Sequence, residues 1–270
     1  MIEYKEFHPY PFLYHFRDPL GTCFSIIKGS KKAIVVDTGY GMGNIRKLVE
    51  SKINTPYIVI NTHGHMDHTC GNYQFDKIYC PEKDLKLCQD NNSCERRKLN
   101  IEDALKAKII DNTFDTDTYI KQGEGNTVKL TMNHINLGDL NIDIIPMPGH
   151  TSGSIGLLIK EKKILLTGDA AILNIWLFLD ESTDRLTYQN MLKETYKLDF
   201  NEFLTGHLMK LYPKRYFKYF LEVSLLATKE NSIPVSFNHF EKSNTYMFTK
   251  KYEGDTIGIC FNANENKKTL

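Results

Sequence analysis

Three histidines and one aspartate fall within six residues of this chain, in the segment Thr62-His63-Gly64-His65-Met66-Asp67-His68. Imidazole and carboxylate groups are common ligands of divalent metal ions in proteins, zinc among them. On a regular helix or strand these side chains would point in several directions. A tight loop lets them converge, and Gly64 supplies the backbone freedom that such a loop needs. The alternative is a surface loop that happens to be rich in histidine, but the clustering favours a metal-binding loop.

Three further candidate ligands lie later in the chain, and each is directly preceded by glycine and by an apolar run. They are His150, Asp169 and His207. Taken singly, each has the pattern of an ordinary turn residue. Open α/β sheets place their sites at the ends of strands, so one cleft could gather all three with the loop. The combined set of five histidines and two aspartates, one of them bridging, offers four protein bonds to each of two metal ions.

The segment before the metal-binding loop has the pattern of a strand–helix–strand unit. Residues 33–36 and 57–60 are short runs rich in β-branched side chains, and residues 41–52 carry apolar side chains at helical spacing. This order predicts two parallel strands joined by a crossover helix. The first run stops at Asp37, and the second leads directly into the loop.

Strands and helices are predicted to alternate along the rest of the chain, without a low-complexity linker. We expect two helices within residues 81–107, strands within 124–133 and 134–145, and a hairpin from 155–160 and 164–167. Helices are expected over 183–198 and 213–230, the second with Pro213 in its first turn, and a hairpin over 245–248 and 256–261. These elements predict one α/β domain over residues 1–270, with a helical insertion at about 81–120 and a C-terminal helix and strands at about 213–262.

Composition restricts the class of protein. The chain has 270 residues, 41% of them hydrophobic, and a formal net charge of +1. That is enough for a sizeable core, and the near-neutral charge gives no electrostatic argument for a dedicated nucleic-acid binder. No stretch reaches the length of a membrane span. The first residues lack the pattern of a signal peptide.

The six cysteines are scattered without a Cys-x-x-Cys pair, which is typical of a reducing compartment. Cys88 and Cys94 are the nearest candidates for a disulfide. We expect a cytoplasmic protein.

The order of these motifs resembles that of the metallo-β-lactamase superfamily. The resemblance runs from about residue 20 to about residue 210 and covers Asp37, the His-x-His-x-Asp-His loop and the three later ligands. It implies a four-layer αββα sandwich, in which two mixed β-sheets pack together with helices on the outer faces. It also implies a binuclear metal site along one edge of that sandwich.

Carried over by position, the resemblance assigns each candidate ligand. The first metal would be held by His63, His65 and His150, and the second by Asp67, His68 and His207, with Asp169 as the bridge. Asp37 would lie outside the coordination and support the site by hydrogen bonding, as partners of metal ligands do. Cys70 lies near the loop, but we interpret it as a buried small residue.

These assignments imply a hydrolase. Two adjacent divalent cations lower the pKa of a shared water from about 16 to about 7, and Asp67 would be the catalytic residue that orients it. Zinc suits the ligand set best, although iron and manganese also bind such ligands. The alternative is a redox protein such as a non-haem iron sulfur dioxygenase, which uses only the first-site histidines and the bridging aspartate. The intact second site favours two metals.

The substrate is predicted only by class. The apolar segment 170–179 is either a core strand or a pocket wall, in which Trp176 and Phe178 would contact an apolar substrate group. The chain resembles the broad branch of glyoxalase II-type thioesterases and lactonases, although we find no basic glutathione-binding cluster in its last sixty residues. It lacks the insertion of the nucleic-acid-processing branch between Asp169 and His207, and the glutamate and flavin domain of the flavodiiron branch. We expect a small-molecule substrate (a lactone, thioester, β-lactam or small phosphoester), with no nucleic-acid or membrane partner and no prediction of oligomeric state.

Overall fold

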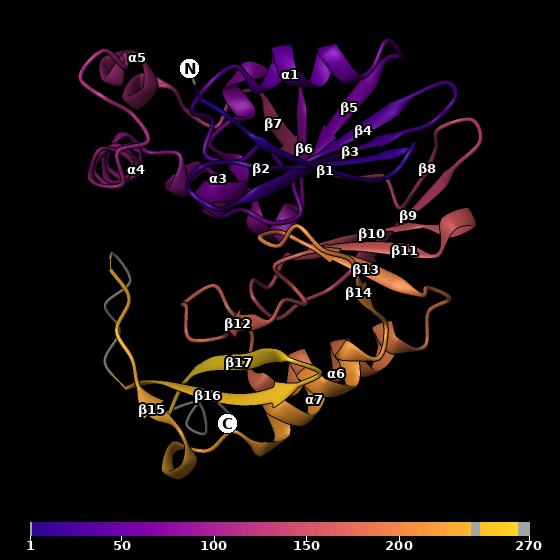
Figure 1. The fold of residues 1–270 in the computed structure, drawn as a ribbon, viewed down its shortest axis with the longest axis vertical. Coiled ribbons are helices and arrows are strands. Elements are labelled where there is room, and N and C mark those ends of the chain that lie inside the picture. The colour runs from indigo at the N-terminus through magenta and orange to yellow at the C-terminus, as the bar shows by residue number, and fades with distance from the viewer. Residues whose placement is uncertain (1, 239–243, 264–270) are drawn as a thin grey trace.

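Two large β-sheets lie face to face in the centre of the computed structural model, which describes residues 2–238 and 244–263 (Figure 1). The first sheet has seven strands, whose spatial order follows the chain: β1 (Lys5–Tyr10), β2 (Leu13–Arg17), β3 (Cys23–Lys28), β4 (Ala33–Val36), β5 (Tyr57–Ile60), β6 (Ile78–Cys80) and β7 (Thr127–Lys129). The second has six strands in the order β14 (Tyr212–Pro213), β13 (Glu202–Thr205), β11 (Ile164–Gly168), β10 (Ile155–Ile159), β9 (Asn141–Pro146) and β8 (His134–Asn136).

The predicted strand–helix–strand unit is present in the first sheet. Strands β4 and β5 pair in parallel, and helix α1 (Ile45–Lys52) connects them. The helix begins four residues later than the sequence pattern predicted, because Gly41 and Gly43 have φ angles of 72° and 105° that no right-handed helix contains. Asn44 caps the helix instead, and its side chain accepts a hydrogen bond from the backbone N–H of Lys47.

Both sheets are mixed, and the second contains the predicted hairpin. Strands β10 and β11 pair antiparallel, as do β9 and β10, whereas β11 and β13 are parallel. The strand predicted within 124–133 is only three residues long, and it joins the first sheet through parallel pairing with β6.

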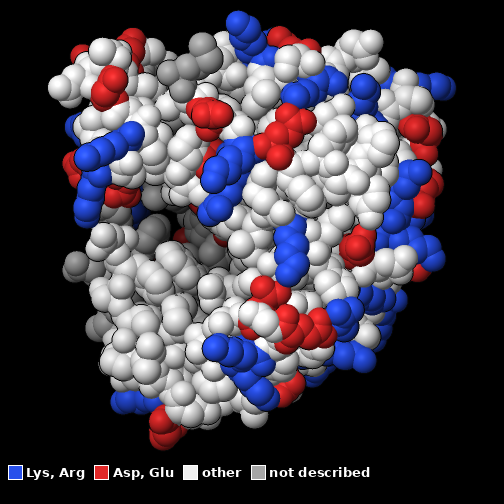
Figure 2. All heavy atoms as spheres, in the orientation of Figure 1, with Lys and Arg blue, Asp and Glu red and all other residues white. Residues whose placement is uncertain are grey.

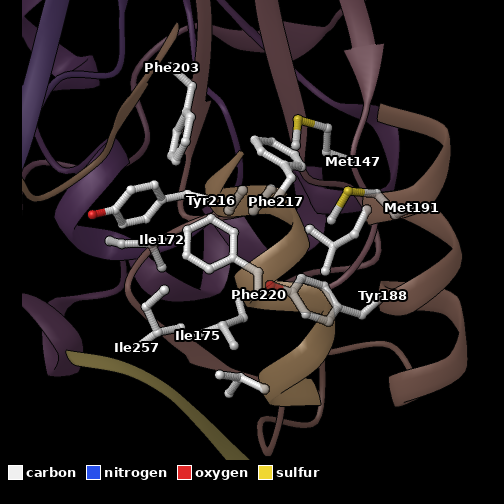
Figure 3. Close-up of a cluster of buried hydrophobic side chains, with 14 of the residues drawn as sticks. Met147, Ile172, Ile175, Tyr188, Met191, Phe203, Tyr216, Phe217, Phe220 and Ile257 are labelled. Carbon is white, nitrogen blue, oxygen red and sulfur yellow. The ribbon is translucent and has the colours of Figure 1, made fainter. Parts of the chain in front are cut away.

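Apolar side chains fill the space between the two sheets. They come mainly from β2 to β5 on one side and from β8 to β11 and β13 on the other. Helix α1 packs on the outer face of the first sheet. Helices α6 (Arg185–Tyr196) and α7 (Tyr216–Leu226) pack on the outer face of the second, through the cluster that Figure 3 shows around Phe217 and Phe220. This arrangement is the predicted four-layer αββα sandwich.

A third, smaller sheet was not predicted as a layer. It consists of four strands in the order β12 (Asn174–Trp176), β17 (Asp255–Asn262), β16 (Thr245–Tyr252) and β15 (Ile233–Pro234). Strands β16 and β17 form the hairpin expected near the end of the chain. Ile257 and Phe261 of β17 join the same apolar cluster as α6 and α7, so this sheet packs against the two helices.

The predicted start of the helix at Pro213 is wrong. Pro213 belongs to β14, the edge strand of the second sheet, where the missing N–H of proline is tolerated. Helix α7 begins at Tyr216 and ends at Leu226. Residues 229–231 form a separate 3₁₀ turn that Thr228 caps.

The remaining helices lie beside the first sheet. The pair predicted within residues 81–107 is present as α3 (Leu85–Asn91) and α4 (Cys94–Lys106), and α5 (Thr116–Lys121) follows. Cys88 is buried and Cys94 is exposed, and both thiols are free. None of the helices in the described ranges combines the length and apolar character that crossing a membrane requires.

Candidate metal centre

All the predicted ligands follow strands that end at one edge of the sandwich. The loop from His63 to His68 follows β5 and includes the short helix α2 (Met66–Thr69). Asp169 and His207 follow β11 and β13, which are parallel neighbours, so the two side chains emerge side by side. His150 follows β9, which runs in the same direction as β11 because each is antiparallel to β10. The topology therefore brings four distant segments together.

The seven side chains form three overlapping groups whose potential ligand atoms lie within 4.8 Å of one another. These groups are His63, His65 and His150; His63, His68 and Asp169; and Asp67, His68 and His207. Asp169 lies between the two outer groups. Its Oδ2 is 3.0 Å from Nε2 of His207 and 3.8 Å from Nε2 of His150, and its Oδ1 is 3.5 Å from Nε2 of His68.

Several of these atoms are buried and make no hydrogen bond within the described part of the chain. They are Nε2 of His63, Nε2 of His68 and Oδ1 of Asp169. Leaving buried polar atoms unsatisfied costs about 1–3 kcal/mol each. Nitrogen and carboxylate lone pairs that converge in this way fit a cation, so the donor set is suited to divalent metal ions.

The nitrogen of each imidazole that faces away from the cluster has a fixed partner. The acceptors are Thr62 Oγ1 for His63, Glu181 Oε1 for His65, Asp37 Oδ2 for His68, the Trp176 carbonyl for His150 and the Gly21 carbonyl for His207, at 2.6–3.2 Å. Such partners set the tautomer and the ring orientation of metal-binding histidines. The rings are therefore oriented by the protein itself.

Asp37 reaches both halves of the cluster from outside. Its φ angle of 63° turns the chain sharply after β4. The carboxylate then accepts hydrogen bonds from the backbone N–H of Thr62 at 2.7 Å, the Thr62 hydroxyl at 2.8 Å and Nδ1 of His68 at 2.9 Å. Because the Thr62 hydroxyl in turn accepts from His63, Asp37 orients one histidine directly and another through threonine.

The two halves of the cluster differ electrostatically. Burial lowers the pKa of His63 well below its usual value and that of His150 to about 4, so these rings are neutral, as coordination requires. Burial also opposes protonation of His207, but the carboxylate of Asp169 outweighs it and raises the pKa of His207 to about 9. The carboxylates of Asp67 and Asp169 thus make the second half strongly attractive to positive charge.

Two supporting carboxylates had no signal in the sequence. Glu181 lies in the loop before α6 and accepts the hydrogen bond from His65. Asp84 is buried and accepts from the backbone N–H of Gly64 at 2.9 Å and from the Thr151 hydroxyl at 2.6 Å. It therefore ties the histidine loop to the loop that carries His150.

A cavity of about 390 Å³ opens beside the cluster. In Figure 2 the surface is hollowed between the part of the molecule that carries α3 and α4 and the part that carries β12. Trp176 lines the cavity with five of the candidate ligands and several apolar side chains. Phe178 is not among the lining residues and packs against Trp176, with ring centroids 5.3 Å apart. Cys70 is fully buried and belongs to none of the three ligand groups.

Comparison with known proteins identifies related sequences and folds. The model of the metallo-β-lactamase superfamily matches residues 18–82, which include Asp37 and the complete histidine loop. The human acyl-coenzyme A thioesterase MBLAC2 is 28% identical over 161 residues, which are 53% of this chain and 56% of that protein. By sequence, the part of the chain that carries the histidine loop thus matches the metallo-β-lactamase superfamily.

Other known proteins match the chain in sequence or in fold. Hydroxyacylglutathione hydrolase GloC of Haemophilus influenzae is 29% identical over 154 residues, which are 54% of this chain and 65% of GloC. The chain thus spans between about half and two thirds of the length of these two relatives. The metallo-β-lactamase from Pontibacter korlensis has the same fold, with a TM-score of 0.57 over 84% of this chain and 100% of that one, at 15% identity. DIM-1 metallo-β-lactamase superposes with a TM-score of 0.56 over the same shares.

Proposed function

We propose that this protein is a metal-dependent hydrolase that binds two divalent cations and uses them to hydrolyse a small ester-like substrate. Zinc is the cation that we favour for both positions. The observation that carries the proposal is the convergence of seven imidazole and carboxylate side chains, several of them buried and without other partners. The second group, Asp67, His68 and His207, argues against the redox alternative. A mononuclear iron site would leave those three side chains without a function.

The geometry supports one assignment of ligands. The first cation would bind to His63, His65 and His150, and the second to Asp67, His68 and His207, with Asp169 between them. Cations held there would supply Lewis acidity and a water-derived nucleophile at neutral pH. Asp67 would accept a hydrogen bond from that nucleophile. The Thr22 hydroxyl, which donates to Oδ2 of Asp67 at 2.9 Å, holds the carboxylate in place.

A thioester is the substrate class that we favour. The human relative is named an acyl-coenzyme A thioesterase, and the Haemophilus relative a hydroxyacylglutathione hydrolase. In this reaction water adds to the acyl carbon and the bond to sulfur breaks, which gives a carboxylic acid and a thiol. Lactones, β-lactams and small phosphoesters belong in the same activity screen. We place the protein in the cytoplasm because its cysteines are scattered along the sequence without a paired motif.

Metal analysis together with the Asp67→Ala variant tests the proposal. We expect two zinc ions per chain, and a loss of thioester hydrolysis of at least about a hundredfold in the variant because a ligand and a hydrogen-bond acceptor are both removed. Far-UV circular dichroism should be unchanged. Asp199→Ala, at a side chain that is 77% exposed, is the matched control and should keep full activity. Full turnover by Asp67→Ala, or one iron per chain with oxygen consumption on a persulfide, would exclude the proposed mechanism.

A further inference from the structure

The lining of the cavity beside the candidate metal centre contains two chemically different groups of side chains. One group consists of candidate ligands: His65, Asp67, His150, Asp169 and His207. The other, which we call the wall, is apolar and consists of Met66, Ile172, Leu173, Trp176, Leu179 and Leu208; Tyr40, Asn91 and Asn174 complete the lining. A substrate whose reacting carbonyl lies at the ligands therefore places its neighbouring atoms against the wall.

Trp176 is held firmly in that wall. Its ring packs against Phe237 and Phe178, with centroids 4.3 and 5.3 Å away. Its backbone pairs with Cys260 of β17, and its carbonyl accepts the hydrogen bond from Nδ1 of His150 at 3.0 Å. The same residue thus fixes the wall and orients a ligand, so the position of the wall relative to the metal centre is largely preformed.

The wall carries no positive charge. None of the described residues that line the cavity is lysine or arginine, and the acidic ones, Asp67 and Asp169, face the metal centre. A second anionic group on the substrate would lose its hydration against leucine, isoleucine and tryptophan without meeting a cation. An uncharged hydrocarbon group would instead gain free energy with every methylene that it buries.

We propose that this wall is an acyl-binding subsite, specific for uncharged, apolar acyl groups. The inference rests on the proposed function, because the metal centre is taken as the place where the carbonyl group binds. The subsite selects among ester-like substrates by their acyl group. It accepts hydrophobic acyl groups and rejects acyl groups that end in a carboxylate.

Binding can be followed without turnover, because Trp176 is the only tryptophan of the chain. The zinc-loaded protein is titrated with acetate, butyrate, hexanoate and octanoate, and with suberate, the dicarboxylate that matches octanoate in length. Tryptophan fluorescence and titration calorimetry are read in parallel, so that binding without a change in emission is still detected. We expect Kd to fall about fourfold per added methylene, the ratio to which about 0.8 kcal/mol corresponds, until the cavity is full. Suberate should bind at least about tenfold more weakly than octanoate.

A charge introduced into the wall should change this preference. Leu173 is half-buried and lines the cavity, and Leu173→Arg keeps Trp176 as the reporter. We expect this variant to bind suberate more tightly than the wild type does and octanoate more weakly. Leu225→Arg makes the same chemical change on α7, at a side chain that is 60% exposed, and should leave both affinities unchanged.

The outcomes separate the subsite from the hydrolytic function. A Kd that does not depend on chain length, or suberate that binds as tightly as octanoate, would overturn the subsite. Equal kcat/KM for acetyl and octanoyl thioesters would do the same while leaving the hydrolase intact. Chain-length-dependent binding without any hydrolysis by the zinc-loaded protein would remove the proposed function and keep the subsite.

Discussion

Each imidazole of the metal centre is bonded on the side that faces away from the other donors, and the partners differ in strength. Four of these acceptors are a hydroxyl, two backbone carbonyls and the fully buried Asp37. Glu181 is the remaining one, and its carboxylate lies 2.6 Å from Nε2 of His65. A carboxylate bonded to a ligating histidine raises the basicity of the ring and holds its orientation. We therefore propose that Glu181 positions His65 for binding of the first cation.

Glu181→Ala should lower zinc affinity at the first site by about 10- to 100-fold, because His65 loses its oriented partner. Glu181→Gln keeps an oxygen acceptor at the same place, so its zinc affinity should fall less than that of Glu181→Ala. Zinc affinity is measured by competition with a chromophoric chelator, and circular dichroism checks the fold. Glu194→Ala changes a glutamate that is 71% exposed and should bind zinc as the wild type does. Equal zinc affinity in Glu181→Ala and the wild type would show that the 2.6 Å contact does not support the site.

At the residue scale the sequence predicted the candidate ligands and one supporting residue, Asp37, but not the supports Asp84 and Glu181. Histidine and aspartate after glycine and an apolar run are visible in the sequence itself. Asp84 and Glu181 are single acids in charged or irregular segments, and their function depends on contacts with Gly64, Thr151 and His65 that only the folded chain creates. No spacing rule connects residues so far apart.

At the scale of elements, the ends of β11 and β13 are packed too closely for any side chain larger than hydrogen. A Cβ atom on Gly206 would lie 2.3 Å from Oδ1 of Asp169 and 2.7 Å from Cε1 of His68. Gly168, the last residue of β11, has a φ angle of 51° and faces the Thr62 side chain. The glycines before the ligands thus allow two neighbouring strands to present their ligands in the same small space.

Gly206→Ala should displace Asp169 or His68 and weaken zinc binding at the second site by at least about tenfold. Forcing a methyl group into this packed region should also lower the free energy of unfolding by about 1–3 kcal/mol. Zinc titration and urea unfolding measure the two effects. The control is Gly123→Ala, where an added Cβ would meet no atom within 4 Å. If Gly206→Ala bound zinc as tightly as the wild type, the ends of β11 and β13 could move apart without weakening the zinc site, and the prediction would be wrong.

Among the elements, periodicity predicted those with a strong local pattern. The parallel pair β4–β5 and the hairpin β10–β11 are continuous apolar runs, and both were predicted. Strands β14 and β15 have two residues each and exist through pairing with a neighbour, so their sequences carry too little pattern. Pro213 suits both a helix start and an edge strand, and tertiary pairing with β13 decides between them.

At the scale of the whole molecule, one buried histidine outside the metal centre links the two large sheets. His15 lies in β2 of the first sheet and bonds the Ser25 hydroxyl at 2.8 Å. It also donates at 3.2 Å to the carbonyl of Leu208, which lies between β13 and β14 of the second sheet. Burial lowers the pKa of His15 to about 4 from its usual 6.5. The folded protein therefore resists protonation at this position, whereas the unfolded chain does not.

This difference makes stability depend on pH in a defined direction. The contribution of His15 to the free energy of unfolding is fully present above about pH 6.5. It is lost as the pH falls toward 4, because the imidazole binds a proton more tightly in the unfolded chain than in the folded protein. Between pH 7 and pH 5 the loss should be about 2 kcal/mol. Urea unfolding in the presence of a chelator measures it, so that release of cations does not contribute. Over this pH range the free energy of unfolding of His15→Gln should fall by about 2 kcal/mol less than that of the wild type. His8 is exposed, so His8→Gln should show the same pH dependence as the wild type. If the free energy of unfolding of His15→Gln fell with pH as steeply as that of the wild type, a group other than His15 would cause the acid sensitivity.

The four-layer arrangement of the whole molecule could be predicted because the ordered motifs identify the superfamily. The third sheet could not, since its parallel neighbours β12 and β17 lie about eighty residues apart in the chain, with α6 and α7 between them in sequence. The apolar segment 170–179 combines both interpretations left open by the sequence. Ile175 and Leu177 belong to the core, whereas Leu173 and Trp176 line the cavity.

The pairing of β12 with β17 connects the wall of the cavity to the C-terminal part of the chain. Every candidate ligand precedes residue 208, whereas the strand that backs Trp176 comes from residues 255–262. Exchanging only the terminal hairpin for that of a related protein would remove the strand that backs Trp176, whose carbonyl accepts the hydrogen bond from His150. We therefore expect such a chimaera to change the cavity wall and the orientation of His150 together.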